Sequence, residues 1–291
     1  MKMGNDRVLY IEPCAGLGNR LSALASARYW ANEMKMELRI VWKKEPPCAA
    51  GYSSIFATDK AISVKEINQM GRRQLHLLQY FYANVWLYFV RRKCYFISAE
   101  DTSEIYEKTG MEGIRAILEK NSQVYMKSTS FFATDEALRQ ENLYNILFNK
   151  ELELRAESII RQYENRNIIG IHIRRTDHTC SINNSPTELF IEKINQILER
   201  DSSTVFYLAT DDADEIAKLP QKGEIVHNEV ALTSGKVTRN TESGIKEAVV
   251  DMLCLSKCMK IYGTKGSTFS NWAAKIGNTS LEILTKENKR L

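Results

Sequence analysis

The segment from residue 8 to residue 42 alternates between strand-like and helix-like patterns, and no other feature constrains the fold as strongly. A short apolar run at residues 8–11 precedes a glycine-containing turn at residues 16–19, and a helical pattern follows from residue 20 to residue 36. A second apolar run begins directly afterwards, at residues 38–42. A strand, a crossover helix and a second strand form a βαβ unit with parallel strands. This opening predicts an α/β protein.

The same alternation returns in the second half of the chain. The patterns there predict, in order, a strand at 168–173, a helix at 186–199, a strand at 205–209, a helix at 213–219, a short strand at 225–226, a helix at 246–257, a strand at 260–262 and a helix from Ser270. Between the two halves, residues 134–165 are strongly charged and carry apolar residues at helical spacing. We therefore predict two Rossmann-like domains that face a cleft, with bounds of 1–165 and 166–291.

The charge of the chain is nearly balanced. Its 40 basic and 36 acidic residues leave a net charge of +4 over 291 residues. This excess is too small to indicate a nucleic-acid partner, although it suits a small anionic ligand. The apolar run at residues 8–11 is also too short for the core of a signal peptide. We expect a globular protein of the cytoplasm, and its composition sets no oligomeric state.

The six cysteines are scattered, and no two of them form a Cys-x-x-Cys pair. A chain of this length needs no disulfides for stability, so we interpret them as reduced thiols. Cys254 and Cys258 would share one face of a helix, but no two further zinc ligands stand near them in the sequence. Core packing is the favoured interpretation, and no metal is predicted.

Residues 74–90 are rich in Leu, Tyr, Phe and Trp, and basic residues flank them on both sides. The segment is slightly short for a membrane span and contains His76, Gln79 and Asn84. A buried helix is therefore favoured. The alternative is an interfacial helix, which would hold the protein peripherally at the inner face of a membrane.

The segment from Asn167 to Asp177 starts with apolar residues suited to a central parallel strand and then becomes polar. This change places His172, Arg174, Arg175 and Asp177 at or just beyond the carboxyl end of the strand, where open α/β sheets bind ligands. Each arginine offers a planar fork of donors that matches phosphate oxygens. One arginine could bind a diphosphate while the other pairs with Asp177. The alternative is a solvated strand end with local salt bridges.

Two further loops are predicted at the same edge of the sheet. The strand at residues 205–209 ends in Thr210-Asp211-Asp212, and we assign Asp211 to the site and Asp212 to the N-cap of the next helix. The loop Gly263-Thr264-Lys265-Gly266-Ser267-Thr268-Phe269-Ser270 leads from a strand into a helix and offers backbone N–H groups to phosphate. Ser267, Thr268 and Ser270 add short donors. Helix capping by Ser270 is the alternative, and the P-loop pattern is absent.

The turn Gly16-Leu17-Gly18-Asn19-Arg20-Leu21 follows the first strand and is similar to a shortened dinucleotide fingerprint. Its glycines, Gly16 and Gly18, permit a close approach of backbone to ligand. Asn19 or Arg20 could contact a sugar or a phosphate.

Together these four elements resemble the superfamily of GDP-fucose-dependent fucosyltransferases, which includes α-1,2, α-1,6 and protein O-fucosyl branches. The turn Gly16-Leu17-Gly18-Asn19 resembles the N-terminal motif of the α-1,2 and O-fucosyl groups. The run His172-Ile173-Arg174-Arg175-Thr176-Asp177 resembles the shared donor motif, and Leu208-Ala209-Thr210-Asp211-Asp212 is similar to the α-1,6 branch. The segments 251–258 and 267–274 are most similar to the α-1,2 type, whereas residues 37–166 match nothing recognisable.

This resemblance implies a GT-B-like fold and inverting transfer of fucose from GDP-fucose to a glycan or glycolipid acceptor. It implies no required metal ion and no cofactor besides the donor substrate. Residues 166–291 would hold the GDP, and residues 1–165 would lie on the acceptor side. If residues 74–90 contact a bilayer, a lipid-linked glycan is the expected acceptor.

The resemblance also implies roles for single residues. Arg174 would bind the β-phosphate and stabilise the leaving GDP, with His172 and Asp251 near the guanine or ribose and the loop Ser267–Ser270 on the diphosphate. Arg175, Asp211, Gly16, Gly18 and Asn19 complete the predicted donor site. Glu12 and Asp177 are the two candidates for the general base that accepts the proton of the acceptor hydroxyl.

Two departures from the family pattern concern linkage specificity. Arg20 stands where the α-1,2 type usually has glutamine, and His178 follows Asp177 where that type tends to have tyrosine. Two other functions stay open on the sequence alone. One is transfer from a different nucleotide sugar, and the other is non-enzymatic binding of a nucleotide or RNA through the basic patches around residues 72–73 and 91–93.

Overall fold

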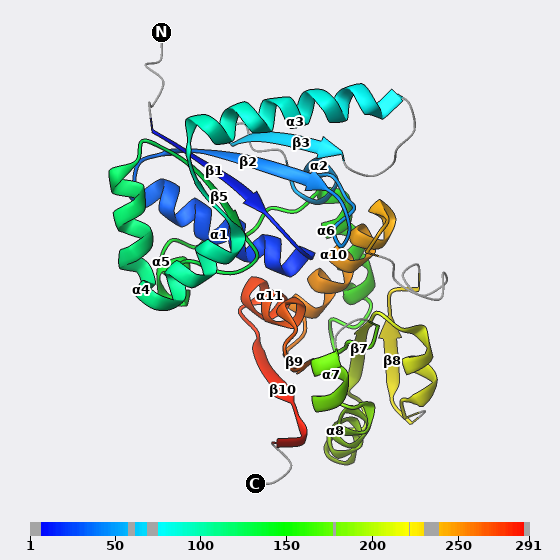
Figure 1. The fold of residues 1–291 in the computed structure, drawn as a ribbon. Coiled ribbons are helices and arrows are strands. Elements are labelled where there is room, and N and C mark those ends of the chain that lie inside the picture. Colours follow the sequence, from blue (N-terminus) through cyan, green and yellow to red (C-terminus); the bar gives the residue numbers. More distant parts are fainter. Residues whose placement is uncertain are drawn as a thin grey trace. The chain divides into compact units, whose positions relative to one another are not determined.

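The computed structural model describes residues 7–57, 62–68, 75–176, 179–220, 222–229 and 239–287, with residues 75–80 described by their backbone alone. The chain divides into two compact units, each with its own sheet (Figure 1). Unit 1 comprises Met1–Leu147 and Arg239–Glu242, and unit 2 comprises Phe148–Thr238 and Ser243–Leu291.

The boundary between the units falls after residue 147, earlier than the predicted boundary after residue 165. The reason is the packing of helix α6 (Lys150–Arg161), which belongs to unit 2. Its Arg155 forms two hydrogen bonds with Glu247, at 3.0 and 2.6 Å, and the backbone carbonyl of Ala156 accepts from the thiol of Cys254. The charged segment at residues 134–165 therefore does not end unit 1: it contains α5 (Asp135–Gln140) of unit 1 and the amphipathic helix α6 of unit 2.

Unit 1 is built on a parallel sheet with the strand order β3-β2-β1-β5-β4 among its described residues. Its elements are β1 (Val8–Pro13), α1 (Leu17–Glu33), β2 (Glu37–Lys44), α2 (Tyr52–Ile55), β3 (Ser63–Asn68), α3 (Leu75–Lys93), β4 (Tyr95–Ile97), α4 (Ala99–Lys120), β5 (Gln123–Ser128) and α5 (Asp135–Gln140). The predicted strand-helix-strand opening is confirmed, since β1 and β2 are parallel neighbours on either side of α1.

Helix α1 is rich in alanine and serine, and it is buried over most of its circumference. Small side chains allow a helix to lie close against a sheet, and the apolar Leu21 and Trp30 complete the contact. The helix begins after Ala15, whose φ of +64° lies in the left-handed region. This turn directs the chain from the carboxyl end of β1 into α1.

Helix α3 contacts the other face of this sheet with one side only. Ala83, Trp86 and Val90 pack around the buried Leu87, against a cluster that contains Tyr10, Val41 and Tyr125. The opposite side of α3 is exposed: Phe81, Tyr82, Tyr88 and Phe89 are between 54% and 69% accessible. The predicted buried helix is thus buried along one face, and none of the described helices is long and apolar enough to cross a membrane.

Unit 2 has a second parallel sheet, with the order β10-β9-β6-β7-β8 among its described residues. Besides α6 its elements are β6 (Ile168–Ile173), α7 (Thr179–Asn184), α8 (Thr187–Arg200), β7 (Val205–Thr210), the 3-10 helix η1 (Ala213–Lys218), β8 (Glu224–His227), α10 (Glu242–Ser256), β9 (Lys260–Thr264), α11 (Thr268–Gly277) and β10 (Ser280–Leu284). Each strand and helix that we predicted in this half is present, with ends that differ by a few residues.

In both units the chain reverses its direction of travel across the sheet. The strand order reverses between β6 and β9 in unit 2, and between β1 and β5 in unit 1. Ligands of open α/β sheets bind outside the carboxyl ends of the strands at such a reversal. The topology therefore marks one candidate position in each unit.

Candidate active site

Thr264 joins the two strands at the reversal point of unit 2. Its hydroxyl donates a 2.7 Å hydrogen bond to the carbonyl of His172 at the end of β6, and it accepts a 3.3 Å hydrogen bond from the backbone N–H of Arg174. The imidazole of His172 is buried and stacks on Phe269 of α11, with ring centroids 4.9 Å apart. The donor motif on β6 and the loop after β9 are therefore held together, as the sequence predicted.

The side chain of Arg175 points into the protein, where most of its hydrogen-bond donors contact other residues of unit 2. Its guanidinium donates to the hydroxyl of Thr187 and to the carbonyl of Ser185, at 2.9 and 3.0 Å, and lies 3.4 Å from a carboxylate oxygen of Glu215. Glu215 is also buried. Arg175 therefore ties the strand end to α8 and η1, whereas the side chain of Arg174 is partly exposed at the same edge.

Asp211 supports the backbone of the arginine motif. Its carboxylate accepts from the N–H of Arg175 at 2.6 Å and from the hydroxyl of Thr176 at 2.7 Å. Asp212 caps η1 by accepting from the N–H of Asp214, as predicted. Asp211 thus fixes the course of the loop that carries Arg174.

The loop between β9 and α11 turns at Gly266, whose φ of +75° favours glycine. Ser267 is the N-cap of α11, and its hydroxyl accepts from the N–H of Phe269. Capping therefore falls to Ser267 and not to Ser270, the alternative that the sequence suggested. Ser270 is buried, and its hydroxyl has no hydrogen-bond partner among the described residues. Thr268 is partly exposed in the first turn of the helix.

The first turn of α11 contains no acidic side chain to complement the positive end of the helix dipole. The backbone of Lys265 fixes the loop before α11 to the segment around α7. Its N–H donates to the hydroxyl of Ser185, and its carbonyl accepts from the hydroxyl of Ser181. The positive end of a helix dipole favours an anion such as phosphate. The loop therefore leads into a helix N-terminus that follows Thr264, the residue hydrogen-bonded to Arg174.

Asp251 does not join this group. It lies on α10, fully buried, and accepts a 2.7 Å hydrogen bond from the hydroxyl of Tyr207 in the middle of β7. Burial raises the pKa of Asp251 to about 7, and the nearby Glu247 adds to the rise, while Tyr207 and Asn228 oppose it. Asp251 therefore lies behind the sheet and not at its edge.

In unit 1, the turn after β1 carries the predicted residues Gly16, Gly18 and Asn19 into the first turn of α1. Gly16 is the N-cap and makes no side-chain hydrogen bond, and Gly18 is buried. Arg20 is fully enclosed: it donates to the carbonyls of Ala15 and Lys43 and stacks on Trp42. Arg20 therefore locks the turn to β2, and Asn19 is the polar side chain of the turn that is left partly exposed.

Glu12 is at the carboxyl end of β1 and is 1% exposed. Its carboxylate lies 2.8 Å from the ammonium of Lys43 and 2.6 Å from the guanidinium of Arg91, and it accepts from the hydroxyl of Tyr125. Burial raises the pKa of Glu12, but Lys43, Tyr125 and Arg91 together outweigh it and lower the pKa to about 2. Asp177, the other candidate base, lies outside the described residues.

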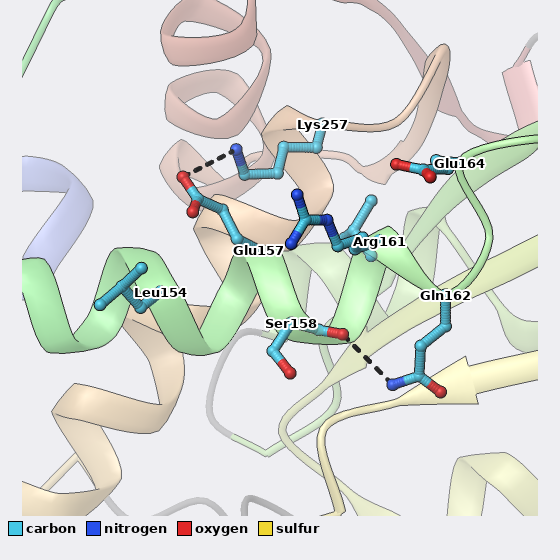
Figure 2. Close-up of a pocket in the computed structure, with 8 residues that line it drawn as sticks. Leu154, Glu157, Ser158, Arg161, Gln162, Glu164 and Lys257 are labelled. Carbon is cyan, nitrogen blue, oxygen red and sulfur yellow. Dashed lines mark hydrogen bonds and ion pairs between the residues drawn. The ribbon is translucent and has the colours of Figure 1, made fainter.

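An open depression of about 780 Å³ lies elsewhere in unit 2 (Figure 2). It is lined by the end of α6, including Glu157, Arg161 and Glu164, and by Lys257 after α10. Lys257 and Glu157 are 4.0 Å apart across it. These residues precede β6 and β9, so the depression is at the amino edge of the sheet, opposite the edge that carries the predicted site. We do not assign the site to it.

Three solved structures share this arrangement of elements. NodZ α-1,6-fucosyltransferase soaked with GDP-fucose is similar over 93% of this chain and 92% of that chain, at 17% identity and a TM-score of 0.58. POFUT1 in complex with GDP is similar over 97% and 99%, at 11% identity and a TM-score of 0.59. A variant of Arabidopsis thaliana FUT1 in complex with GDP is similar over 95% and 70%, at 12% identity and a TM-score of 0.60.

The chain has the fucosyltransferase fold. The predicted GT-B-like class with two Rossmann-like units is therefore confirmed. No family model matches the sequence, and no curated protein matches it. The similarity to the fucosyltransferase fold is thus one of structure, at identities of 11–17%.

Several residues that support the candidate site were not predicted as site residues from the sequence. In unit 2 these are Thr187, Glu215 and Thr264, and in unit 1 they are Lys43, Arg91, Tyr125 and Lys127. Lys43 and Lys127 did carry a signal, because each is a charged residue at the carboxyl end of an apolar strand, as Glu12 is. The contacts of Thr187 and Glu215 had no such signal, since they depend on how α8 and η1 pack beside β6.

Proposed function

We propose that this chain transfers fucose from GDP-fucose to a glycan or glycolipid acceptor. The fold supports this, because it is shared with proteins crystallised with GDP or GDP-fucose. The observation that carries the proposal is the Thr264 connection, which holds the arginine motif of β6 beside the N-terminus of α11 at the reversal point of the sheet. Unit 2 then holds the donor, and unit 1 is the acceptor side.

Arg174 is the residue that we assign to the leaving diphosphate. Cleavage of the sugar–phosphate bond leaves negative charge on GDP, and a fixed guanidinium and helix N–H groups stabilise charge at that position. Ser267, Thr268 and the backbone of the first turn of α11 supply the second set of donors. These groups can carry the departing charge without a metal ion, and full activity in EDTA is the expected result.

For the nucleoside we propose the stacked pair of His172 and Phe269 at the edge of the sheet, where the ring of Phe269 is partly exposed over the buried His172. Asp251 would act indirectly, because its hydrogen bond with Tyr207 holds α10 against β7. Arg175 and Asp211 hold the loop that carries Arg174. Gly16, Gly18 and Asn19 of unit 1 would contact the sugar or its phosphates through the turn before α1.

Inverting transfer needs an acceptor for the proton of the attacking hydroxyl. Glu12 is a weak base, because a carboxylate with a pKa near 2 has little affinity for a proton at neutral pH. Its two oxygens are also occupied by cations and by Tyr125. Between the two predicted candidates, we therefore favour Asp177 as the base and give Glu12 a positioning role.

We further propose that α3 gives peripheral contact with an anionic membrane surface. The exposed Phe81, Tyr82, Tyr88 and Phe89 would enter the headgroup region, where aromatic side chains are favourable. Exposed cations at the end of the helix, Arg92 and Lys93 among them, would pair with anionic headgroups. A lipid-linked glycan is the acceptor class that fits such a contact.

A thermal-shift series tests the proposed donor. A ligand that binds only the folded protein stabilises it. When the ligand concentration is a hundred times the dissociation constant, the free energy of unfolding rises by about 2.7 kcal/mol. We expect GDP and GDP-fucose to raise the melting temperature, with UDP-glucose and a short RNA leaving it unchanged. Stabilisation by RNA but not by GDP would contradict the proposed enzyme and indicate a nucleic-acid-binding protein. Stabilisation by UDP-glucose alone would change the donor and keep the fold-based assignment of a glycosyltransferase.

A further inference from the structure

Five side chains meet at the reversal point of the sheet in unit 1, and we call them the Glu12 cluster. Its members are Glu12 of β1, Lys43 of β2, Arg91 of α3, and Tyr125 and Lys127 of β5. Glu12 and Lys127 are register partners on neighbouring strands. The strand order reverses between β1 and β5, so the cluster occupies the position where open parallel sheets bind ligands.

The Glu12 cluster contains three cations and one carboxylate. The ammonium of Lys43 is 2.8 Å, the guanidinium of Arg91 2.6 Å and the ammonium of Lys127 3.6 Å from a carboxylate oxygen of Glu12. Because Glu12 is ionised at neutral pH, these four groups carry a net charge of +2. One carboxylate therefore does not neutralise the cluster. The three cations also repel one another, and a bound anion would reduce this repulsion.

The cations keep donors for a further partner. An ammonium has three N–H donors and a guanidinium has five, and Glu12 takes only a part of them. The Nε of Arg91 is itself buried, so the donors of Arg91 that a ligand can reach are those of its terminal nitrogens. Lys43, Arg91 and Lys127 are 14%, 31% and 29% exposed, whereas Glu12 is 1% exposed. Solvent-borne ligands can thus reach the cations but not the carboxylate that holds them in place.

An aromatic surface adjoins these cations. The guanidinium of Arg91 lies over the rings of Tyr125 and Phe96, 5.0 and 5.4 Å from their centroids. Phe96 is on β4 beside Tyr125 and is 43% exposed. An exposed ring next to uncompensated cations suits a ligand that has both an apolar ring face and an anionic group.

We infer that the Glu12 cluster binds the anionic group of a negatively charged sugar in the acceptor, either a carboxylate or a phosphate. This inference rests on the proposed fucosyl transfer, because it assigns the acceptor's charge. Lys43, Arg91 and Lys127 bind the anion by charge-assisted hydrogen bonds. Glu12 is a positioning residue that fixes the three cations in one orientation before the ligand arrives.

Matched sugars test the inference by calorimetry, in the presence of GDP. The probes are galacturonic acid for a carboxylate, galactose 6-phosphate for a phosphate and galactose as the neutral counterpart. We expect one or both anionic sugars to bind at least about tenfold more tightly than galactose, as a charge-assisted hydrogen bond provides. The difference should shrink between low and high salt, because partly exposed charges are screened.

Variants locate the binding. Lys127→Gln and Lys43→Gln should each weaken binding of the anionic sugar about tenfold and leave galactose binding unchanged. Lys120→Gln is the matched control, an exposed lysine at the opposite edge of the same sheet, and it should change neither. Two lysine variants are used so that one poorly folded protein does not decide the outcome.

A separate measurement keeps the two proposals distinguishable. GDP-fucose binding is followed by melting temperature in the same samples. If GDP-fucose binds and the anionic sugars bind no more tightly than galactose, the anion site is wrong while the donor assignment holds. If GDP-fucose does not bind, the proposed transfer fails, and preferential binding of an anionic sugar that depends on Lys43 and Lys127 would still support a site at the Glu12 cluster.

Discussion

Arg174 and Arg175 are neighbours in sequence, yet their side chains have different surroundings. Arg175 is held by Thr187, Ser185 and Glu215 inside unit 2. Arg174 is partly exposed at the ligand-binding edge, and its backbone is fixed through Thr264. Both arginines follow the last residue of β6, where the chain leaves the sheet. Their different contacts are the basis for proposing a chemical role for Arg174 and a structural role for Arg175.

The two arginines should therefore respond differently to substitution. Arg174→Ala should lower the turnover of GDP-fucose by a hundredfold or more, since one fixed donor contributes on the order of 3 kcal/mol to the transition state. Its free energy of unfolding should stay close to that of the wild type. Arg175→Ala should instead unfold more easily, by about 2 kcal/mol, because the buried Glu215 loses a cation. Turnover and urea unfolding of both variants check this. Wild-type turnover by Arg174→Ala contradicts the donor assignment.

Glu12 makes the stability of the protein depend on pH. Its pKa is about 2 in the folded protein and 4.5 as the ordinary value. The unfolded chain therefore takes up the proton first as the pH falls. The stability that Glu12 contributes is complete above about pH 4.5 and is lost progressively between pH 4.5 and 2.

Urea unfolding between pH 3 and 7 should show this loss. The shift of pKa corresponds to about 3 kcal/mol for complete protonation, and Glu12→Gln should remove that part of the pH dependence. Glu37→Gln is a control on the neighbouring strand, since Glu37 is partly exposed and paired only with Arg39 in the described contacts. Equal pH profiles for Glu12→Gln and the wild type would show that the ionised cluster does not stabilise the fold.

At the scale of an element, α3 differs most from what its composition suggests. Its composition favoured a buried helix over an interfacial one, but the sheet of unit 1 covers only the face that contains Ala83, Trp86, Leu87 and Val90. The 3.6-residue period places four described aromatic side chains on the other face, namely Phe81, Tyr82, Tyr88 and Phe89. The exposed face of α3 combines aromatic rings with cations at the end of the helix. An anionic lipid surface is the partner that fits this combination.

Flotation with vesicles checks this contact. The wild type should float with vesicles that contain phosphatidylserine and should bind less at high salt. The double variant Phe81→Ser, Tyr82→Ser should float several-fold less, because both side chains are more than 60% exposed and do not support the core. Leu154→Ser is a matched control, an exposed apolar residue on α6 of unit 2. Equal flotation of all three proteins, or none by the wild type, argues against a membrane role for α3.

At the scale of the whole molecule, each unit has a parallel sheet with one reversal point, and each reversal point carries basic side chains. In unit 2 the basic residue is Arg174, beside a helix N-terminus. In unit 1 the Glu12 cluster carries an excess of two positive charges. The positions of the basic side chains therefore say more about ligand binding than the net charge of +4 does. Two such basic positions fit the proposed reaction between a nucleotide donor and a charged acceptor.

Hydrogen exchange can assign the donor to one unit of the intact protein. Saturating GDP should slow amide exchange in residues 171–176 and 263–272 of unit 2, because binding reduces local opening there. Residues 37–44 of unit 1 should exchange as fast as in the ligand-free protein. Protection confined to unit 1 would reverse the assignment of donor and acceptor sides.

The sequence by itself determined the class of unit 2 and the order of most of its elements, although it did not predict α7 or β10. The buried strands there are continuous apolar runs, and the polar residues that follow them had to lie at one edge, since parallel strands end on the same side. This reasoning placed His172, Arg174, Asp211 and the loop Ser267–Ser270 together. It did not predict β3, whose residues are mostly exposed at the edge of the sheet and form no apolar run.

Only the tertiary structure decided which of these residues are enclosed by other elements and which stay partly exposed. The burial of Arg175 and Asp251 depends on α8, η1 and β7, which are distant in sequence, and no local pattern encodes such contacts. The Glu12 cluster joins residues from four elements for the same reason. Sequence periods report which face of an element is apolar, whereas the charge balance of a site depends on the side chains that packing brings within a few ångströms.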